Sequence, residues 1–427
     1  MSDVTPPNAA ALWLHQISLE NIGPFVSASL SLCHEAGNPA PITLLTGQSG
    51  TGKTLVLDSV REALSWVFAM AGAGHYLHDT GAMRALLRRG SSEGRVRLDG
   101  ARLSEGVRYR RTANHRPAVD FQFAHDGHAR AWLSAVKQRF VFDYWDTSLP
   151  TGPFAVSNFA RRDHDSFQSN ALSGRVEARS ITDLICQFDY LRSSDDDDEK
   201  RTGEALMAAT RQIAELAMLD GGRFVRVERS TFTPLFEQAG SLVSIDQLST
   251  GNTYLVSRLL TLLGHMHSAQ VVNGLAAEQM LQSPGLLLID EVEAHLHPRW
   301  QSRVLPGIRG LFPNVQVIAT THSPFVLASA PDAKVFTTRV RAERDACEIV
   351  DSTRDYSAMP IESILASEAF DFTLPFGPEV ARLFSARLVA LEDGRFEDAR
   401  AIEDQLIEIN PDHFAWLRLR SIEGAAE

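Results

Sequence analysis

The residues from Gly47 to Thr54 have the types and the spacing of a loop that binds phosphate groups. The segment reads Gly-Gln-Ser-Gly-Thr-Gly-Lys-Thr, which fits the pattern G-x-x-x-x-G-K-[ST]. Glycines let the backbone curl so that its N–H groups point at phosphate oxygens. Lys53 can reach the β- and γ-phosphates, and the Thr54 hydroxyl can ligate Mg²⁺. The segment therefore predicts ATP and Mg²⁺ as ligands.

The neighbouring residues place this loop between a strand and a helix. Residues 42–45 form a short apolar run that is typical of a buried strand. The N-terminus of a helix that starts after Gly52 would add its positive dipole to the phosphate site. Apolar residues recur at helical spacing after the loop, at Val56, Val60, Ala63, Leu64 and Val67.

Two adjacent acids, Asp290 and Glu291, follow the apolar run Leu286–Ile289. Such a run is typical of a parallel strand that is buried on both faces, and ligands bind at the carboxyl edge of parallel sheets. We predict that Asp290 holds the Mg²⁺ shell and that Glu291 polarises a water molecule for attack on the γ-phosphate.

Two further segments could reach the same nucleotide. Residues 315–320 form another buried-strand pattern just before His322, which could sense or stabilise the γ-phosphate at the same edge. Ser249 and Gly251 stand at the start of a helical pattern, an arrangement that caps a helix and can bind an anion. Taken alone, this second pattern is equally typical of an ordinary capped helix.

Together, these segments resemble the motifs of ABC-type ATPases, in the same order along the chain. Gly47–Thr54 matches Walker A, and Leu248–Asn252 matches the signature motif. Leu286–Glu291 matches Walker B, and His322 matches the switch histidine. The resemblance covers residues 12–340 and implies an α/β fold. The implied fold is that of a P-loop NTPase with an ABC-type core, in which a mixed sheet is flanked by antiparallel strands.

The segments Asp290–Pro298 and Thr320–Pro324 narrow the resemblance to the SMC/RecF/OLD-like group. Stand-alone ATPases of bacterial anti-phage systems, such as the Septu-type ATPase and retron-associated relatives, carry similar segments. The signature departs from the common LSGGQ in reading Leu-Ser-Thr-Gly-Asn, and Gln138 and Gln168 are both open candidates for the Q-loop. The sequence lacks the heptads of a coiled-coil arm. It also lacks a TOPRIM-like nuclease module after the ATPase, so we do not expect the chain to cut DNA itself.

The family mechanism implies a homodimer that meets head to tail, with ATP at the interface. Glu291, His322 and Lys53 would be catalytic, and Thr54 and Asp290 would bind the metal. ATP binding would close the dimer, and hydrolysis would reopen it. The nucleotide would be held by Gly47, Gln48, Ser49, Gly50, Thr51, Gly52, Lys53 and Thr54 of one chain together with Ser249 and Gly251 of the other.

In this family the segment Glu293–Pro298 would be the D-loop at the dimer interface. His295 and His297 within it also invite a zinc interpretation. Alternate positions beside a proline rarely converge on a metal without further ligands, so we favour the D-loop interpretation.

The motifs and the composition divide the chain into four regions. Residues 12–185 are the N-terminal part of the ATPase core with Walker A, and 186–240 are an insertion with an acidic loop and a short helix. Residues 241–340 complete the core with the signature, Walker B and the switch histidine. Residues 341–427 form a mainly helical tail, whose last part resembles a tetratricopeptide-like hairpin that must pack on the ATPase or on a partner.

Local patterns add detail to these regions. Residues 13–19 and 139–144 are typical of strands, and the alternation in 95–123 predicts antiparallel strands. Residues 146–180 are rich in turn-forming residues and predict a loop. The acidic run 195–199 is predicted to be a solvated loop tip, because consecutive carboxylates point in different directions and make a poor metal site.

The composition is that of a soluble globular protein, with 44% hydrophobic and 22% charged residues and a net charge of −12. The sequence shows no secretory signal, no apolar run long enough to cross a bilayer and no cysteine pattern of a zinc site or disulfide framework, so we predict a cytoplasmic protein without membrane contact. The acidic balance disfavours wholesale DNA wrapping but leaves nucleic acid open as a partner. Local basic clusters could bind it or could be solvated strand edges: Arg84, Arg88, Arg89, Arg95 and Arg97, then Arg108, Arg110, Arg111 and Arg116.

These features favour a slow ATPase that regulates a separately encoded effector, such as a nuclease, in bacterial anti-phage defence. A RecF-like ATPase acting in DNA repair or replication is the first alternative. The nucleotide-binding subunit of a membrane transporter is the second, and the long separation of the signature from Walker A argues against it.

Overall fold

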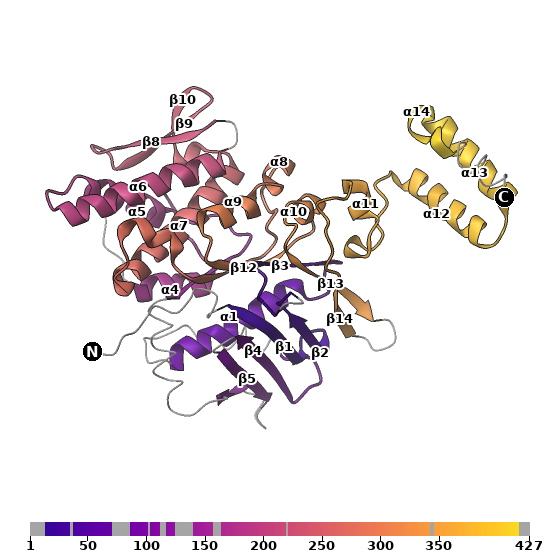
Figure 1. Cartoon of the computed structure of the whole chain (residues 1–427), viewed down its shortest axis with the longest axis horizontal. Helices are drawn as coiled ribbons and strands as arrows, with labels where there is room; N and C mark the ends of the chain where they lie inside the picture. Colours follow the sequence, from indigo (N-terminus) through magenta and orange to yellow (C-terminus); the bar gives the residue numbers. More distant parts are fainter. Residues whose placement is uncertain are drawn as a thin grey trace. The chain divides into compact units, whose positions relative to one another are not determined.

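The computed structural model describes residues 13–34, 37–70, 86–100, 103–111, 117–123, 140–156, 164–218, 221–341 and 346–417. The chain divides into two compact units, Met1–Met359 and Pro360–Glu427 (Figure 1). The boundaries expected at residues 185 and 340 both fall inside regular elements, a helix and a strand of the first unit.

A sheet of 11 strands runs through the first unit. Across the sheet the order is β6-β5-β4-β1-β2-β14-β13-β3-β12-β11-β7. The strands are β1 (Leu14–Ile22), β2 (Phe25–Ser31), β3 (Ile42–Gly47), β4 (Glu93–Gly100), β5 (Leu103–Arg111), β6 (Pro117–Phe123), β7 (Val141–Trp145), β11 (Gly285–Ile289), β12 (Val315–Thr320), β13 (Lys334–Arg341) and β14 (Ala346–Asp351).

The sheet is mixed, as predicted. Strands β13, β3, β12, β11 and β7 are parallel, and every residue of the inner strands β3, β12 and β11 is buried. Strands β2, β1, β4, β5 and β6 form an antiparallel flank, which confirms the strands predicted in residues 95–123. Strand β14 joins the two parts, antiparallel to β13 and paired to β2 through Cys347 and Phe25.

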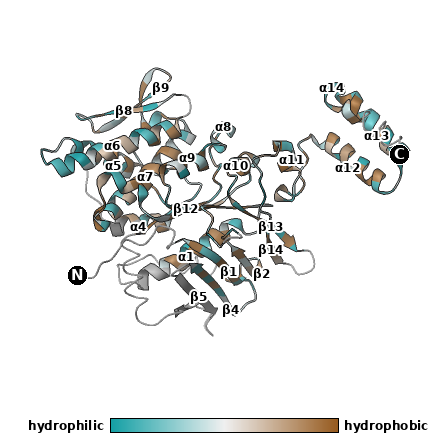
Figure 2. Cartoon of the chain, in the orientation of Figure 1, coloured by the Kyte–Doolittle hydropathy of each residue, from teal (hydrophilic) through white to brown (hydrophobic). Residues whose placement is uncertain are grey.

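Helix α1 (Lys53–Met70) packs against strands of both parts of this sheet. Its apolar side chains share one core with both parts, including Val56 and Val60 of the helix, Ile17 and Leu98 of the antiparallel flank, and Leu288 of the parallel part. Hydrophobic and hydrophilic residues alternate along β1 and β2 (Figure 2), as expected for strands with one face toward the core. The phosphate-binding loop is therefore held between a fully buried strand and a helix that anchors the main core.

A lobe of helices with a small sheet contains the expected insertion, residues 186–240, and extends beyond it at both ends. It comprises α4 (His164–Ser173), α5 (Ala178–Arg192) and α6 (Asp197–Ala217), which pack with α7 (Thr250–Asn273), and a small sheet of β8 (Arg223–Glu228), β9 (Thr233–Gln238) and β10 (Ser241–Ser244) (Figure 1). The predicted loop over 146–180 is wrong where α4 and the start of α5 lie. The burial of Phe167 and Ala171 explains this error, because core packing offsets the weak helix propensity of α4.

The acidic run is exposed, as predicted, but it begins a helix instead of forming a loop tip. The Asp196 carboxylate accepts hydrogen bonds from the backbone N–H groups of Asp198 and Glu199. Three acids then occupy the first turn of α6, where negative charge is favourable to the helix dipole. The run is therefore an N-terminal cap, and its residue types have a structural reason.

The second unit is helical, as predicted for the tail. It contains α11 (Ile361–Leu365), α12 (Pro378–Glu392), α13 (Phe396–Ile409) and α14 (Pro411–Phe414). Helices α12 and α13 form the expected hairpin around a small core of Leu383, Leu406 and Phe414. None of the described helices of the chain has the length and apolar character that crossing a membrane requires.

Candidate nucleotide site

The phosphate-binding loop follows β3 in a conformation that requires glycine. Gly47 has φ 117° and Gly52 has φ 99°, values that side-chain-bearing residues rarely adopt. A Cβ atom on Gly47 would lie 2.1 Å from the carbonyl oxygen of Thr338 on β13. The tip of the loop, Gln48 to Gly50, is exposed, whereas Thr51 is buried against the Thr338 hydroxyl at 2.5 Å. Strand β13 thus packs against the phosphate-binding loop through Thr338.

Lys53 is folded back over this loop. Its ammonium donates hydrogen bonds to the carbonyls of Gly47 at 2.9 Å and Gln48 at 2.7 Å. Burial lowers the pKa of Lys53, and the carboxylates of Asp290, Glu291 and Glu293 oppose that shift. A cation held here lies beside the N–H groups of the loop, in the position expected for contact with phosphate.

Thr54 and Asp290 bring two oxygen ligands together from different elements. The Thr54 hydroxyl at the start of α1 lies 3.0 Å from both carboxylate oxygens of Asp290 at the end of β11. A hydroxyl and a carboxylate are the hard oxygen ligands that Mg²⁺ prefers. These residues therefore fit the predicted metal next to the phosphate-binding loop.

Thr320 fixes both acids of Walker B, a role that the sequence did not suggest. Its hydroxyl donates to Oδ1 of Asp290 at 2.7 Å and accepts the backbone N–H of Glu291 at 2.7 Å. Glu291 is exposed and has φ 49°, a sparsely populated conformation for a residue other than glycine. A residue of the neighbouring strand β12 thus fixes the backbone of Glu291, the proposed catalytic base.

His322 follows β12 at the same edge, and its side chain is exposed. Partial burial lowers its pKa, and the Lys53 ammonium lowers it further, against the opposing charges of Glu293, Glu291 and Asp290. The imidazole is therefore neutral near pH 7. The structure brings Lys53, Thr54, Asp290, Glu291 and His322 to one place at the carboxyl edge of the sheet.

Ser249 and Gly251 belong to a different element, the N-terminus of α7. The Ser249 hydroxyl caps the helix by accepting the N–H of Asn252 at 3.3 Å. A Cβ atom on Gly251 would lie 2.6 Å from the carbonyl oxygen of His295. Within the described parts of the chain, no hydrogen bond joins Ser249 or Gly251 to Lys53, Thr54 or Asp290.

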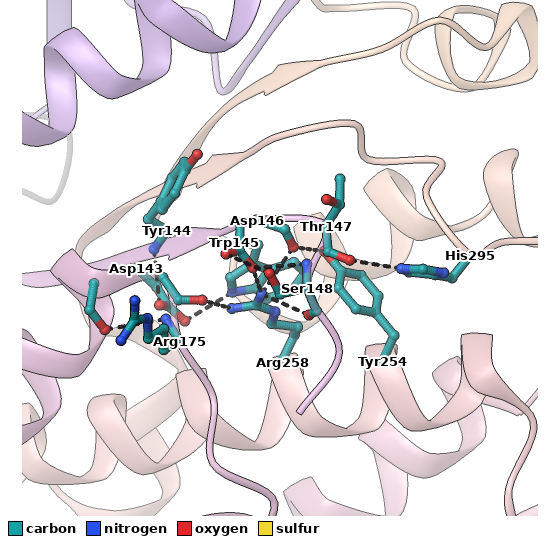
Figure 3. A network of polar contacts seen from close by, with 12 residues as sticks. Asp143, Tyr144, Trp145, Asp146, Thr147, Ser148, Arg175, Tyr254, Arg258 and His295 are labelled. Atoms are coloured by element: carbon teal, nitrogen blue, oxygen red, sulfur yellow. Dashed lines mark hydrogen bonds and ion pairs between the residues drawn. The ribbon is translucent and has the colours of Figure 1, made fainter. Parts of the chain in front are cut away.

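A polar network connects α7 to the loop that leaves β7 (Figure 3). The buried guanidinium of Arg258 forms an ion pair with Asp146 and donates to the carbonyls of Gly174 at 2.8 Å and Ser148 at 3.2 Å. Tyr254, one turn earlier on α7, donates to the carbonyl of Asp146 at 2.9 Å. The sequence reasoning missed this network because its members carry no local motif.

The same network reaches the D-loop segment. A ring nitrogen of His295 lies 2.8 Å from the carbonyl oxygen of Thr147, and its ring centroid is 5.5 Å from that of Tyr254 (Figure 3). His297 caps α8 (Pro298–Gln301) by accepting the N–H of Arg299. Both histidines therefore have structural roles, and the described residues contain no group of three or more metal-ligating side chains that could hold a metal ion.

The two candidates for the Q-loop differ in what the structure says of them. Gln138 lies outside the described residues, and Gln168 lies in α4 and not in the loop that leaves β7. The loop that leaves β7 next to Walker B begins instead with Asp146. The Asp146 carboxylate pairs with Arg258, so this residue links the loop after β7 to helix α7.

Asp143 lies beneath this network, fully buried in β7. Its carboxylate accepts hydrogen bonds from the indole N–H of Trp145 at 2.9 Å and from the N–H of Tyr144 at 2.9 Å. Burial raises the pKa of Asp143 to about 6, although the hydrogen bond from Trp145 and the charge of Arg258 oppose that shift. The group therefore titrates close to neutral pH.

Known proteins resemble this chain in sequence. Over 403 residues, it is 21% identical to the Septu protein PtuA of Bacillus mycoides (strain KBAB4), covering 92% of this chain and 50% of that protein. Over 96 residues, it is 35% identical to the retron Vc95 probable ATPase of Vibrio cholerae serotype O1 biovar El Tor, covering 22% of this chain and 18% of that protein. The chain thus spans about half the length of the first relative and less of the second.

The chain is also similar to a solved structure and matches a family of protein domains. The solved SMC head bound to the C-winged helix domain of ScpA covers 81% of this chain and 99% of that one, at 15% identity and a TM-score of 0.48, a value too low to establish a common fold. Residues 42–328, well over half of the chain, match a family of P-loop ATPase domains. The chain belongs to this family, which is described as "AAA domain, putative AbiEii toxin, Type IV TA system".

Proposed function

We propose that this chain is an ATPase that closes into a head-to-tail dimer around ATP and regulates a separately encoded effector, such as a nuclease, in bacterial anti-phage defence. The observation that carries the proposal is the division of the site. Lys53, Thr54 and Asp290 converge at the edge of the sheet, whereas Ser249 and Gly251 begin α7 and, among the described residues, form no hydrogen bond with them. A second chain would bring the two halves together.

The residues of the first half have distinct tasks in the proposed reaction. Lys53 would contact the β- and γ-phosphates, which replace the loop carbonyls as its partners. Thr54 and Asp290 would hold Mg²⁺, which supplies neutralisation of phosphate charge when bound. Glu291 would accept a proton from the attacking water, and neutral His322 would donate a hydrogen bond to the γ-phosphate.

The second half would act in trans. The N-terminus of α7 offers the backbone N–H groups of a first helical turn and a positive dipole, and Ser249 adds a hydroxyl at the same point. Binding of the γ-phosphate by this helix would hold the dimer closed until hydrolysis removes the phosphate. ATP would thus act as a timer, which is why we expect slow turnover.

The assignment to defence is supported by the relatives. Septu proteins and a retron ATPase are among the similar sequences, and the match to PtuA covers 92% of this chain. The chain spans only about half of that relative. We therefore propose, on the basis of this similarity, that an effector partner and an activating trigger exist.

The solution mass of Glu291→Gln tests the ATP-gated dimer. This variant should bind ATP and hydrolyse it at least about 100-fold more slowly, because the water loses its base. Light scattering should then show twice the monomer mass with Mg²⁺-ATP and the monomer mass without it. Lys53→Ala should stay monomeric with ATP, and Ser249→Arg should bind ATP without dimerising. A mass of Glu291→Gln that ignores ATP would contradict the gated dimer.

Phage challenge tests the role in defence. A host that carries this gene with its neighbouring genes should plate phage less efficiently than a host without them. Lys53→Ala should restore plating if ATP controls the effector. Equal protection by Lys53→Ala and the unaltered protein would contradict the role of ATP in defence.

A further inference from the structure

Glu293 makes two contacts that the motifs do not account for. It lies three residues beyond Asp290, in the turn between β11 and α8, and is partly buried. One carboxylate oxygen accepts the hydroxyl of Thr321 at 2.6 Å, and the other accepts the backbone N–H of His322 at 2.5 Å. Hydrogen bonds to a charged acceptor are stronger than those between neutral groups. The carboxylate thus forms hydrogen bonds with two consecutive residues, Thr321 and His322, of the loop that follows β12.

The rest of that loop is fixed on either side of His322. The backbone N–H of Thr321 donates to the carbonyl of Leu45 in β3 at 2.9 Å. The hydroxyl of Ser323 donates to the amide oxygen of Gln301 at 2.6 Å, and that amide also donates to the carbonyl of Leu296 at 2.9 Å. Of these contacts, the one from Glu293 acts on the His322 peptide itself.

The turn that carries Glu293 is itself firmly held. Glu291 and His295 have φ values of 49° and 63°, which bend the turn tightly on both sides of Glu293. The His295 ring contacts the carbonyl of Thr147, and the N–H of Val292 donates to the carbonyl of Thr320 at 3.0 Å. The backbone of Glu293 is therefore well fixed, and its carboxylate can orient His322 through the hydrogen bond from the His322 N–H.

We propose that Glu293 is a positioning residue for the ATPase reaction, which holds His322 in the orientation that faces the γ-phosphate. The proposal rests on the proposed function, because it assigns Glu293 to the site where His322 would act. The His322 side chain is exposed and has no packed core to orient it, so its direction depends on how its backbone is fixed. The negative charge of Glu293 also lies close to both Lys53 and His322.

A double-mutant cycle with His322 tests this assignment. Glu293→Ala should lower kcat by roughly 10- to 100-fold, the effect of a small displacement of a catalytic group, with KM for ATP nearly unchanged. In the His322→Ala background, Glu293→Ala should cause no further loss. Glu293→Gln should recover part of the rate, because it keeps one acceptor oxygen but presents an amide N–H₂ to the second donor.

The matched control is Glu278→Ala, which removes an exposed acid from a different part of the first unit and should leave kcat unchanged. Equal losses from Glu293→Ala in the two backgrounds would overturn the proposal, since Glu293 would then act independently of His322. An unchanged kcat in Glu293→Ala would overturn it as well.

Hydrogen exchange tests the contact between Glu293 and His322 without relying on ATP hydrolysis. If the unaltered protein fails to hydrolyse ATP, the proposed function is contradicted, but this test of Glu293 still applies. The amide of His322 should exchange at least about tenfold faster in Glu293→Ala than in the unaltered protein, because its acceptor is lost. Exchange elsewhere in the sheet, as in β11, should not change. An unaltered exchange rate at His322 would overturn the positioning role.

Discussion

At the scale of single residues, threonine hydroxyls organise the candidate site as much as its charged groups do. Thr320 joins the two acids of Walker B, Thr321 meets Glu293, and Thr338 supports the phosphate-binding loop by contacting Thr51 and the carbonyl of Thr46. A hydroxyl can donate and accept at once, so one side chain can link a carboxylate to a backbone N–H. These contacts hold the charged groups at defined distances from each other.

The residues that the sequence did predict share one property: their role follows from a short local motif. Lys53, Thr54, Asp290 and Glu291 lie at one edge of the sheet, because a glycine-rich loop and a buried strand each define their own local geometry. Thr320 and Glu293 lie in the segments Thr320–Pro324 and Asp290–Pro298, but their hydrogen-bond partners are about 30 residues away in the chain. Only the fold reveals such pairs.

Asp143 provides a residue-scale test through pH. Its pKa is raised to about 6 in the folded protein, from an ordinary value of 3.8. The folded state therefore holds a proton that the unfolded state releases between pH 4 and 6, and the stabilisation present below pH 4 is lost as the pH rises through 6. Relative to Asp143→Asn, the unaltered protein should gain roughly 2 to 3 kcal/mol of unfolding free energy between pH 7 and pH 4.

Urea unfolding of both proteins at several pH values measures this difference. The comparison with Asp143→Asn removes the titration of all other groups, which the two proteins share. A difference that stays constant from pH 7 to pH 4 would mean that Asp143 titrates alike in the folded and unfolded chains.

At the scale of elements, helix α7 is the piece that joins the signature to the rest of the core. Its first turn rests on the D-loop segment through Gly251, and its second and third turns hold the loop after β7 through Tyr254 and Arg258. Arg258 is only 2% exposed, and a buried charge without its partner would be costly. Movement of the signature would therefore be transmitted to the end of β7 in the same chain.

Gly251→Ala tests the seat of α7. A methyl group would lie 2.6 Å from the backbone oxygen of His295, so α7 or the D-loop must shift. Although alanine favours helix, we expect a net loss of about 1 to 3 kcal/mol of unfolding free energy. Gly310→Ala, in α9 (Val304–Leu311) with nothing within 4 Å of its Cβ, is the control and should be neutral or up to about 1 kcal/mol more stable. Equal stability of the two variants in urea would refute the close contact.

The elements that could be predicted from the sequence were those with strong periodicity. Strands β1, β3, β7, β11 and β12 and the tail hairpin α12–α13 lie where their patterns indicated. Helix α4 was missed because its sequence favours turns and its helical state depends on burying Phe167 and Ala171. The strand order could not be predicted either, since it depends on pairings between distant segments.

At the scale of the whole molecule, the candidate site residues of the chain all belong to the first compact unit. The sheet, α1, α7 and the switch loop lie before Met359, and the second unit has its own small core around Leu383 and Leu406. Residues such as Leu388, Val389 and Phe396 are exposed on the hairpin of that unit. The two units therefore each have the contacts of an independent folding unit.

A chain ending at residue 359 tests this independence. It should fold, show a cooperative thermal transition and be stabilised by Mg²⁺-ATP to the same extent as the full chain, since ligand stabilisation depends on affinity. Circular dichroism melting with and without nucleotide measures both properties. A fragment that aggregates or ignores ATP would show that the first unit needs the second.

The position of β3 in the sheet has a consequence for how the protein is made. This strand pairs with β12 and β13, whose residues are synthesised nearly 300 positions after Gly47. At a ribosomal rate of roughly 5 to 20 residues per second, this strand, which is fully buried in the folded protein, waits about 15 to 60 s for its partners. During that time its edges are open to wrong pairing. The nascent chain would therefore be most vulnerable to aggregation before residue 341 has emerged, and a chaperone that shields this segment would raise the yield of folded protein.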